Sequence, residues 1–145
     1  MSENYRQALI KSHIQADPFA KMLGAMVEDV QAGYSRATLL IHDHHLNFHG
    51  TTHGGVIFSL ADIAFAAASN SRGQTAVALN VDISFLQAVT VGERIVAEAR
   101  EISLNGPIGL YDITVKNQKT GDLIAQNQAM AYRKKQFFVE EAGDE

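Results

Sequence analysis

Residues 54–70 read GGVIFSLADIAFAAASN, and this segment decides the architecture of the chain. Drawn as a helix, the segment places apolar side chains on nearly every side, with Asp62 as its one charged residue. A helix that is apolar all round is buried in the middle of a fold. We therefore expect a long helix from Gly54 to about Asn70, with the rest of the chain wrapped around it.

Beyond this helix the hydrophobic pattern changes to strict alternation, which is typical of half-buried strands. From Val77 to Phe85 every odd-numbered residue is large and apolar, so these positions are expected to share one face, opposite Asn80 and Asp82. Three further strands are expected over residues 91–102, 109–117 and 123–133, with hairpin turns at Asn105-Gly106 and Thr120-Gly121.

Upstream of the central helix the sequence predicts a helical segment over about 3–23 and two strands, around 25–30 and 34–41. Asp17-Pro18 has the pattern of an N-cap followed by a proline in the first helical turn. All these elements together indicate one α+β domain over residues 1–145, in which an antiparallel sheet curls around one long helix. A strand beside that helix could also pair across a two-fold axis. The acidic tail, 140–145, is expected to fray.

The composition is that of an ordinary globular domain, with 46% hydrophobic and 19% charged residues in a chain of 145. A formal net charge of −4 provides no general basic field for nucleic acid or an anionic membrane. The chain has no cysteine, which excludes thiol catalysis and thiolate metal sites. Without a signal peptide or a membrane-length apolar run, cytoplasmic residence is the default expectation.

Asp62 is the residue of the central helix that helix propensity does not explain. It lies beyond the first turn, where the helix dipole no longer stabilises an anion, and its neighbours are apolar. Two interpretations are open: Asp62 lies on a wetted stripe of the helix, or it is a partly desolvated carboxylate. Desolvation would raise its pKa and its basicity, as a general base requires.

Gly54 and Gly55 begin the helix, where backbone N–H groups are expected to point outward without partners. Such groups, reinforced by the helix dipole, can stabilise the oxyanion of a tetrahedral intermediate, and glycine lets a substrate carbonyl approach closely. Asp62 lies about 12 Å further along the helix axis. That separation is too large for one reacting carbon within one chain, so the site is expected at a dimer interface.

The residues NFHGTTHGGVIFSLAD (47–62) resemble the motif of the hotdog-fold acyl-CoA thioesterases of the phenylacetate-degradation (PaaI-like) type. The resemblance continues through DISFL (82–86), VGE (91–93) and GLYD (109–112), and spans about 23–133. It implies a hotdog fold, sheets joined between two protomers, usually in a tetramer, and hydrolysis of an acyl-CoA substrate. The acyl group is expected to be aryl, arylacetyl or medium-chain.

The resemblance also implies roles for individual residues. Asp62 matches the catalytic acid, acting as general base or nucleophile, and Gly54 the backbone donor to the thioester carbonyl. Asn47 matches the residue that orients the thioester or the water, and His53 lies beside the oxyanion hole. Asn80 stands where many relatives carry Ser or Thr, a departure that affects the placing of the water. We also expect substrate contacts from Gly55, Phe58 and Phe65.

A thiolate leaves readily because a thiol has a pKa of about 8.5, so no metal and no cofactor is expected. Coenzyme A phosphates would require cations, and those available are Arg72, Lys116, Arg133, Lys134 and Lys135.

Five of the six histidines lie between positions 42 and 53, but they lack the spacing of a zinc site. We expect His42, His44 and His45 to be solvated or ion-paired loop residues.

Two other functions compete with thioester hydrolysis. One is a non-catalytic acyl-CoA-binding module, and the other is a hotdog hydratase, for which the chain lacks a suitable Asp/His pair.

Overall fold

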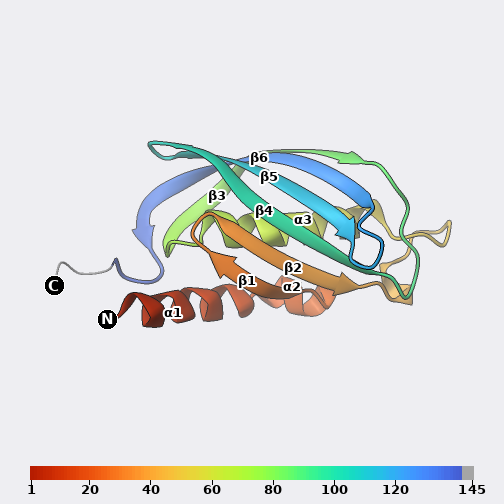
Figure 1. Ribbon diagram of the computed structural model, residues 1–145, viewed down its shortest axis with the longest axis horizontal. Helices are drawn as coiled ribbons and strands as arrows, with labels where there is room; N and C mark the ends of the chain where they lie inside the picture. The colour runs from red at the N-terminus through yellow and green to blue at the C-terminus, as the bar shows by residue number, and fades with distance from the viewer. Residues whose placement is uncertain (142–145) are drawn as a thin grey trace.

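The computed structural model describes residues 1–141 and places one long helix, α3 (Gly54–Ser69), inside a six-stranded antiparallel sheet (Figure 1). In the order in which they lie side by side, the strands are β1 (Met26–Gln31), β2 (Tyr34–Leu40), β4 (Arg94–Asn105), β5 (Ile108–Asn117), β6 (Leu123–Phe137) and β3 (Gln74–Phe85). The curved sheet around α3 confirms the predicted α+β hotdog architecture.

The inner face of the sheet combines large apolar side chains with a set of alanines, which let the helix approach the strands closely. From α3, Leu60 and Ala64 are fully buried, and Phe65 contacts the ring of Tyr111 edge-on at a centroid distance of 5.5 Å. The sheet contributes six alanines with no exposed surface, namely Ala37, Ala97, Ala99, Ala125, Ala129 and Ala131. Burial of this interface is the main source of stability in the fold.

Strand β3 departs from the predicted alternation because its register shifts at Leu79. Residues directly opposite one another in a sheet share a face. Val81 lies opposite the fully buried Ala129, whereas Val77 lies opposite the exposed Tyr132. The prediction that all the odd-numbered positions share one face is therefore wrong, since the extra residue of the bulge reverses the alternation.

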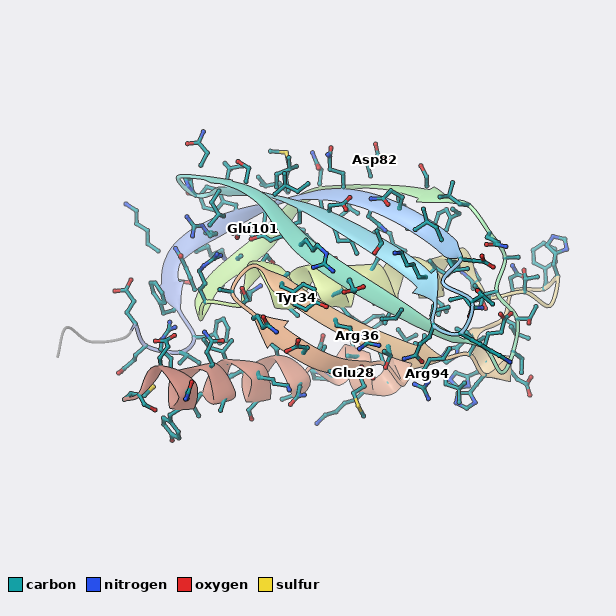
Figure 2. All side chains as sticks on the ribbon, viewed as in Figure 1. Glu28, Tyr34, Arg36, Asp82, Arg94 and Glu101 are labelled. Atoms are coloured by element: carbon teal, nitrogen blue, oxygen red, sulfur yellow. The ribbon has the colours of Figure 1, made fainter. Side chains whose placement is uncertain are left out.

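Strand β3 has an exposed outer face and one edge without a neighbouring strand in the described chain. Figure 2 shows Asp82 pointing away from the outer face of the sheet, and β3 is an edge strand with no neighbour beyond it in the described chain. Exposed apolar side chains along it include Val77, Leu79 and Phe85. A long apolar edge strand is a template for pairing with another chain.

The N-terminal segment forms α1 (Glu3–Gln15) and α2 (Pro18–Leu23), with α1 lying along β1 (Figure 1). The Asp17 carboxylate accepts the backbone N–H of Phe19 at 3.0 Å, which confirms the predicted N-cap. Among the helices between residues 1 and 141, none has the length and hydropathy of a membrane-crossing segment.

The C-terminal residues that can be described are held against α1. Arg6 is buried, and its Nε donates to the Glu140 carbonyl at 2.7 Å while Nη2 donates to the Arg72 carbonyl. The predicted fraying of 140–145 stays a prediction, and positions 142–145 lie outside the described residues.

Candidate active site

Asp62 lies on the stripe of α3 that stays accessible to solvent, together with Phe58 and Ala66. Its side chain is half-buried, and no described residue donates a hydrogen bond or an ion pair to its carboxylate. Loss of hydration raises the pKa of Asp62, and the nearby negative charge of Asp17 raises it further. The carboxylate therefore has increased basicity and no partner, which are the properties a general base needs.

Gly54 and Gly55 are not equivalent at the start of α3. The N–H of Gly55 donates to the imidazole Nδ1 of His53 at 2.8 Å, because His53 is the N-cap of the helix. The N–H of Gly54 has no acceptor among residues 1–141. The prediction that both N–H groups point out unpaired is wrong for Gly55, and Gly54 is left as the one free donor of the pair.

A groove of about 360 Å³ lies beside Gly54. Thr52, Gly54 and Ile57 line one part of it, and the segment 85–88 after β3 lines the rest. A Cβ added to Gly54 would stand 3.5 Å from the ring of Phe85, which is an ordinary contact distance. The bare backbone at Gly54 therefore opens directly onto this groove.

Asn47 is half-buried and holds the loop that precedes α3. Its Oδ1 accepts the backbone N–H of His49 at 2.9 Å and that of Thr51 at 3.3 Å, and its Nδ2 donates to the Thr51 hydroxyl at 3.1 Å. These contacts fix the segment that delivers His53 to the helix start. One Nδ2 proton is left for a ligand.

The remaining predicted contacts are dispersed. Phe58 is 36% exposed on the open stripe of α3, near Asp62, whereas Phe65 is 2% exposed and packs in the core against Tyr111. Asn80 is exposed on the outer face of β3, with its amide 3.9 Å from the sulfur of Met130. Within one chain, the structure therefore brings Phe58 to the site and leaves Phe65 and Asn80 away from it.

His45 is the histidine whose environment differs from the sequence-based prediction. It is 1% exposed, its Nε2 lies 2.7 Å from the Leu23 carbonyl, and its Nδ1 accepts the His42 N–H at 2.9 Å. Burial lowers the pKa of His45. The expectation of a solvated or ion-paired loop residue is wrong for this position, because His45 joins the end of α2 to the loop that leads to α3.

Two of the five basic residues that could bind the coenzyme A phosphates already have partners within the chain. Arg72 forms a bidentate ion pair with Glu101 at 2.7 and 2.9 Å, which holds the pKa of Glu101 below its ordinary value. Arg133 donates to the Gly106 carbonyl.

No group of three or more histidine or acidic side chains within residues 1–141 is arranged to hold a metal ion.

A family model described as the Thioesterase superfamily matches residues 49–124, which include the helix start, Asp62 and strands β3, β4 and β5. The acyl-coenzyme A thioesterase PaaI of Escherichia coli is 39% identical over 103 residues, which cover 71% of this chain and 74% of that protein.

Solved structures agree with this match. The E. coli PaaI protein, from the phenylacetic acid degradation operon, superposes with a TM-score of 0.86 at 32% identity, covering 94% of this chain and 99% of that one. A variant of the phenylacetic acid degradation protein PaaI of Thermus thermophilus gives 0.77 at 36% identity, covering 81% and 100%. The protein smu.793 of Streptococcus mutans, bound to acetyl-CoA, gives 0.70 at 27% identity, covering 74% and 86%.

The curved sheet around one long helix, together with these matches, defines a hotdog-fold thioesterase. The chain belongs to the Thioesterase superfamily and is a PaaI-like member of it, which makes the protein a thioester hydrolase.

Proposed function

We propose that the protein hydrolyses an acyl-CoA thioester to a free acid and coenzyme A. The observation that carries this proposal is the unpaired, half-buried carboxylate of Asp62 on the open stripe of an otherwise buried helix. The names of the relatives support the same substrate, since the E. coli protein is an acyl-coenzyme A thioesterase and the S. mutans protein binds acetyl-CoA.

In the proposed mechanism Asp62 removes a proton from a water molecule as the water oxygen attacks the thioester carbonyl carbon. The carbonyl oxygen becomes an oxyanion and accepts a hydrogen bond from the Gly54 N–H, which the dipole of α3 reinforces. The C–S bond then breaks and coenzyme A leaves as a thiolate, which recovers a proton from Asp62 or water. Attack by Asp62 itself, through an anhydride that water then cleaves, uses the same groups.

The proposed site takes its groups from two chains. Gly54 and Asp62 are separated by about 12 Å along the axis of α3, so both cannot act on one carbon from the same subunit. The open edge of β3, with its exposed Leu79 and Phe85, supports pairing with a second copy about a two-fold axis. We infer a homodimer as the smallest active unit, and a tetramer of two such dimers by analogy with the family.

The substrate we favour is an arylacetyl-CoA, because the two PaaI proteins are named for phenylacetic acid degradation. In this proposal His53 holds the helix start beside the oxyanion, Asn47 orients the thioester, and Phe58 contacts the substrate. Gly55 completes the helix cap, and Phe65 acts through packing in the core at a distance from the reacting carbon. Cytoplasmic residence and a role in phenylacetate degradation stay predictions.

The test follows the release of free thiol from phenylacetyl-, benzoyl-, octanoyl- and palmitoyl-CoA. Asp62→Asn keeps the size of the side chain and removes its basicity, so kcat should fall by about 10²- to 10⁴-fold while binding of the ester persists. Ser59→Ala, one turn before Asp62 on the same helix, is the matched control and should stay within a few-fold of wild type. Equal turnover by wild type and Asp62→Asn would refute the catalytic assignment.

A further inference from the structure

Thr52 is buried just before the start of α3, and the mechanism above gives it no role. Its hydroxyl donates to the Val89 carbonyl at 2.8 Å, and its backbone N–H donates to the same oxygen at 2.9 Å. Thr52 is 6% exposed and Val89 is 1% exposed, so both bonds are shielded from water. A carbonyl oxygen has two lone pairs, and here one residue occupies both of them.

The two residues belong to opposite walls of the groove beside Gly54. Thr52 and Gly54 line one wall, and the segment 85–88 lines the other. Val89 follows directly on that segment. Within residues 1–141, the hydrogen bonds that cross from one wall to the other both come from Thr52. The contact between Thr52 and Val89 therefore connects the two walls.

Each wall is also anchored to a different part of the fold. The N–H groups of Leu86 and Gln87 both donate to the Ile124 carbonyl of β6, at 2.8 and 3.3 Å. On the other side, the His53 N–H donates to the His45 carbonyl at 2.8 Å. Neither anchor fixes the separation between the walls, which leaves that task to Thr52.

The position of the free Gly54 N–H depends on this separation. Thr52 precedes Gly54 by two positions in the sequence, and a Cβ added to Gly54 would stand 3.5 Å from the ring of Phe85 in the opposite wall. An oxyanion donor must lie within about 3 Å of the charge it stabilises. Because a misplacement of about 1 Å costs up to about 10²-fold in rate, a small change in the groove is expected to reduce turnover.

We propose that Thr52 is a positioning residue for hydrolysis, whose two bonds to the Val89 carbonyl hold the Gly54 N–H at its working distance from the thioester carbonyl. The inference rests on the proposed function and adds to it a residue that acts through Gly54. The segment 85–88 continues from β3, the strand inferred to pair with a second copy. Thr52 therefore also links the donor of a subunit to the strand through which that subunit dimerises.

The first test removes the hydroxyl alone. Thr52→Val keeps the size of the side chain and the backbone bond to Val89, so kcat for thiol release from phenylacetyl-CoA should fall by about 10- to 100-fold while KM stays within a few-fold. Thr52→Ser restores the hydroxyl and should recover most of the loss.

Thr38→Val is the matched control. Thr38 is a buried threonine of β2 whose hydroxyl donates to Glu28 at 2.9 Å, and it does not line the groove. The control should also lose the stability of one hydrogen bond but keep the wild-type kcat. A wild-type kcat in Thr52→Val, or an equal loss in Thr38→Val, would overturn the proposal.

A double-mutant cycle separates positioning from a general loss of structure. Gly54→Pro removes the N–H through which Thr52 is proposed to act. In that background, Thr52→Val should change kcat by less than about twofold, because residues that act through one contact are not additive. A full 10- to 100-fold further loss, as independent effects would give, would overturn the proposal.

Amide hydrogen exchange without substrate distinguishes failure of this inference from failure of the proposed function. Thr52→Val should speed exchange of the His53 and Leu86 N–H groups by about tenfold and leave Ala64, in the middle of α3, at the wild-type rate. Faster exchange in a protein that hydrolyses no acyl-CoA would refute the hydrolytic function, while Thr52 would still hold the groove. Hydrolysis by wild type, with Thr52→Val equal to Thr38→Val in exchange and kcat, would refute the role of Thr52 alone.

Discussion

The imidazole Nδ1 of His53 accepts the backbone N–H of Gly55 at 2.8 Å, while the N–H of Gly54 has no acceptor in the described chain. Two adjacent glycines thus have different tasks at the start of α3. One N–H closes the helix cap, and the other stays available to a ligand in the groove that Gly54 lines. The bond also fixes the His53 tautomer, because Nδ1 can accept only when it carries no proton.

The Gly54 donor can be removed without removing the helix. Proline is tolerated at the first helical position, and His53 already has the extended backbone that a following proline requires, with φ −60° and ψ 134°. Gly54→Pro should therefore fold and reduce kcat by about 10²- to 10³-fold, the effect of losing one oxyanion donor. Gly54→Ala keeps the N–H and adds a Cβ that meets Phe85 only at 3.5 Å, so this variant measures the effect of added bulk with the donor still present. Equal kcat values for the two folded variants would remove Gly54 from the mechanism.

The His53 cap should be measurable in the stability of the protein. His53→Ala removes the acceptor of the Gly55 N–H and should lower the free energy of unfolding by about 1 kcal/mol. His53→Asn supplies another capping oxygen and should recover most of that loss. Urea unfolding of the three proteins at one pH checks this prediction, and a His53→Ala variant as stable as wild type would show that the cap contributes nothing.

Asp62 should reduce stability at neutral pH. Its pKa is raised in the folded protein, so the unfolded chain loses its proton more readily and ionisation favours unfolding as the pH rises through the folded pKa. Asp62→Asn should be more stable than wild type at pH 7 by less than about 1 kcal/mol, because solvent screens a half-buried charge. The difference should disappear below the ordinary carboxyl pKa. Thermal melts between pH 3 and pH 8 provide the measurement, and a gain that persists at pH 3 would point to packing instead.

Wild-type activity should show the same titration. Asp62 acts as a base only when ionised, so kcat/KM should fall on acidification at a pH above that at which an exposed aspartate is protonated. A pH–rate profile with its acid limb at or below the ordinary carboxyl value would contradict the desolvation of Asp62.

His45 should make the protein sensitive to mild acid. Its pKa is lowered by burial, so protonation favours the unfolded chain, and stability should fall as the pH drops below the ordinary imidazole value of about 6.5. His45→Gln keeps a donor toward the Leu23 carbonyl without a titrating ring, and its stability should depend less on pH between 7.5 and 5. His49→Gln changes an exposed histidine and should keep the wild-type slope. Parallel slopes for all three proteins would rule out His45 as the acid-sensitive group.

The long-range periodicities of the sequence predicted the fold well. The all-round apolar helix and the alternating strands correspond to α3 and the sheet, since both patterns record burial directly. The bulge at Leu79 was missed because alternation was extended through a position where one extra residue reverses it.

The site was predicted less completely because its details depend on side-chain geometry. The cap on Gly55 depends on the side-chain conformation of His53, a residue type that is not a preferred N-cap. Burial of His45 depends on the Leu23 carbonyl, which is distant in sequence. A pocket between α1 and α3 has His13 and Phe138 in its wall, and no local pattern joins those two positions.

In the proposed site Asp62 of one subunit and Gly54 of another act on the same thioester, and a mixed dimer separates the two contributions. Asp62→Asn and Gly54→Pro homodimers should each be nearly inactive. When the two chains are refolded together in equal amounts, about half of the dimers are mixed, and one of the two sites in each mixed dimer has both groups intact. The mixture should therefore recover about a quarter of wild-type thiol release from phenylacetyl-CoA. A mixture that contains mixed dimers but stays as inactive as its parents would contradict it.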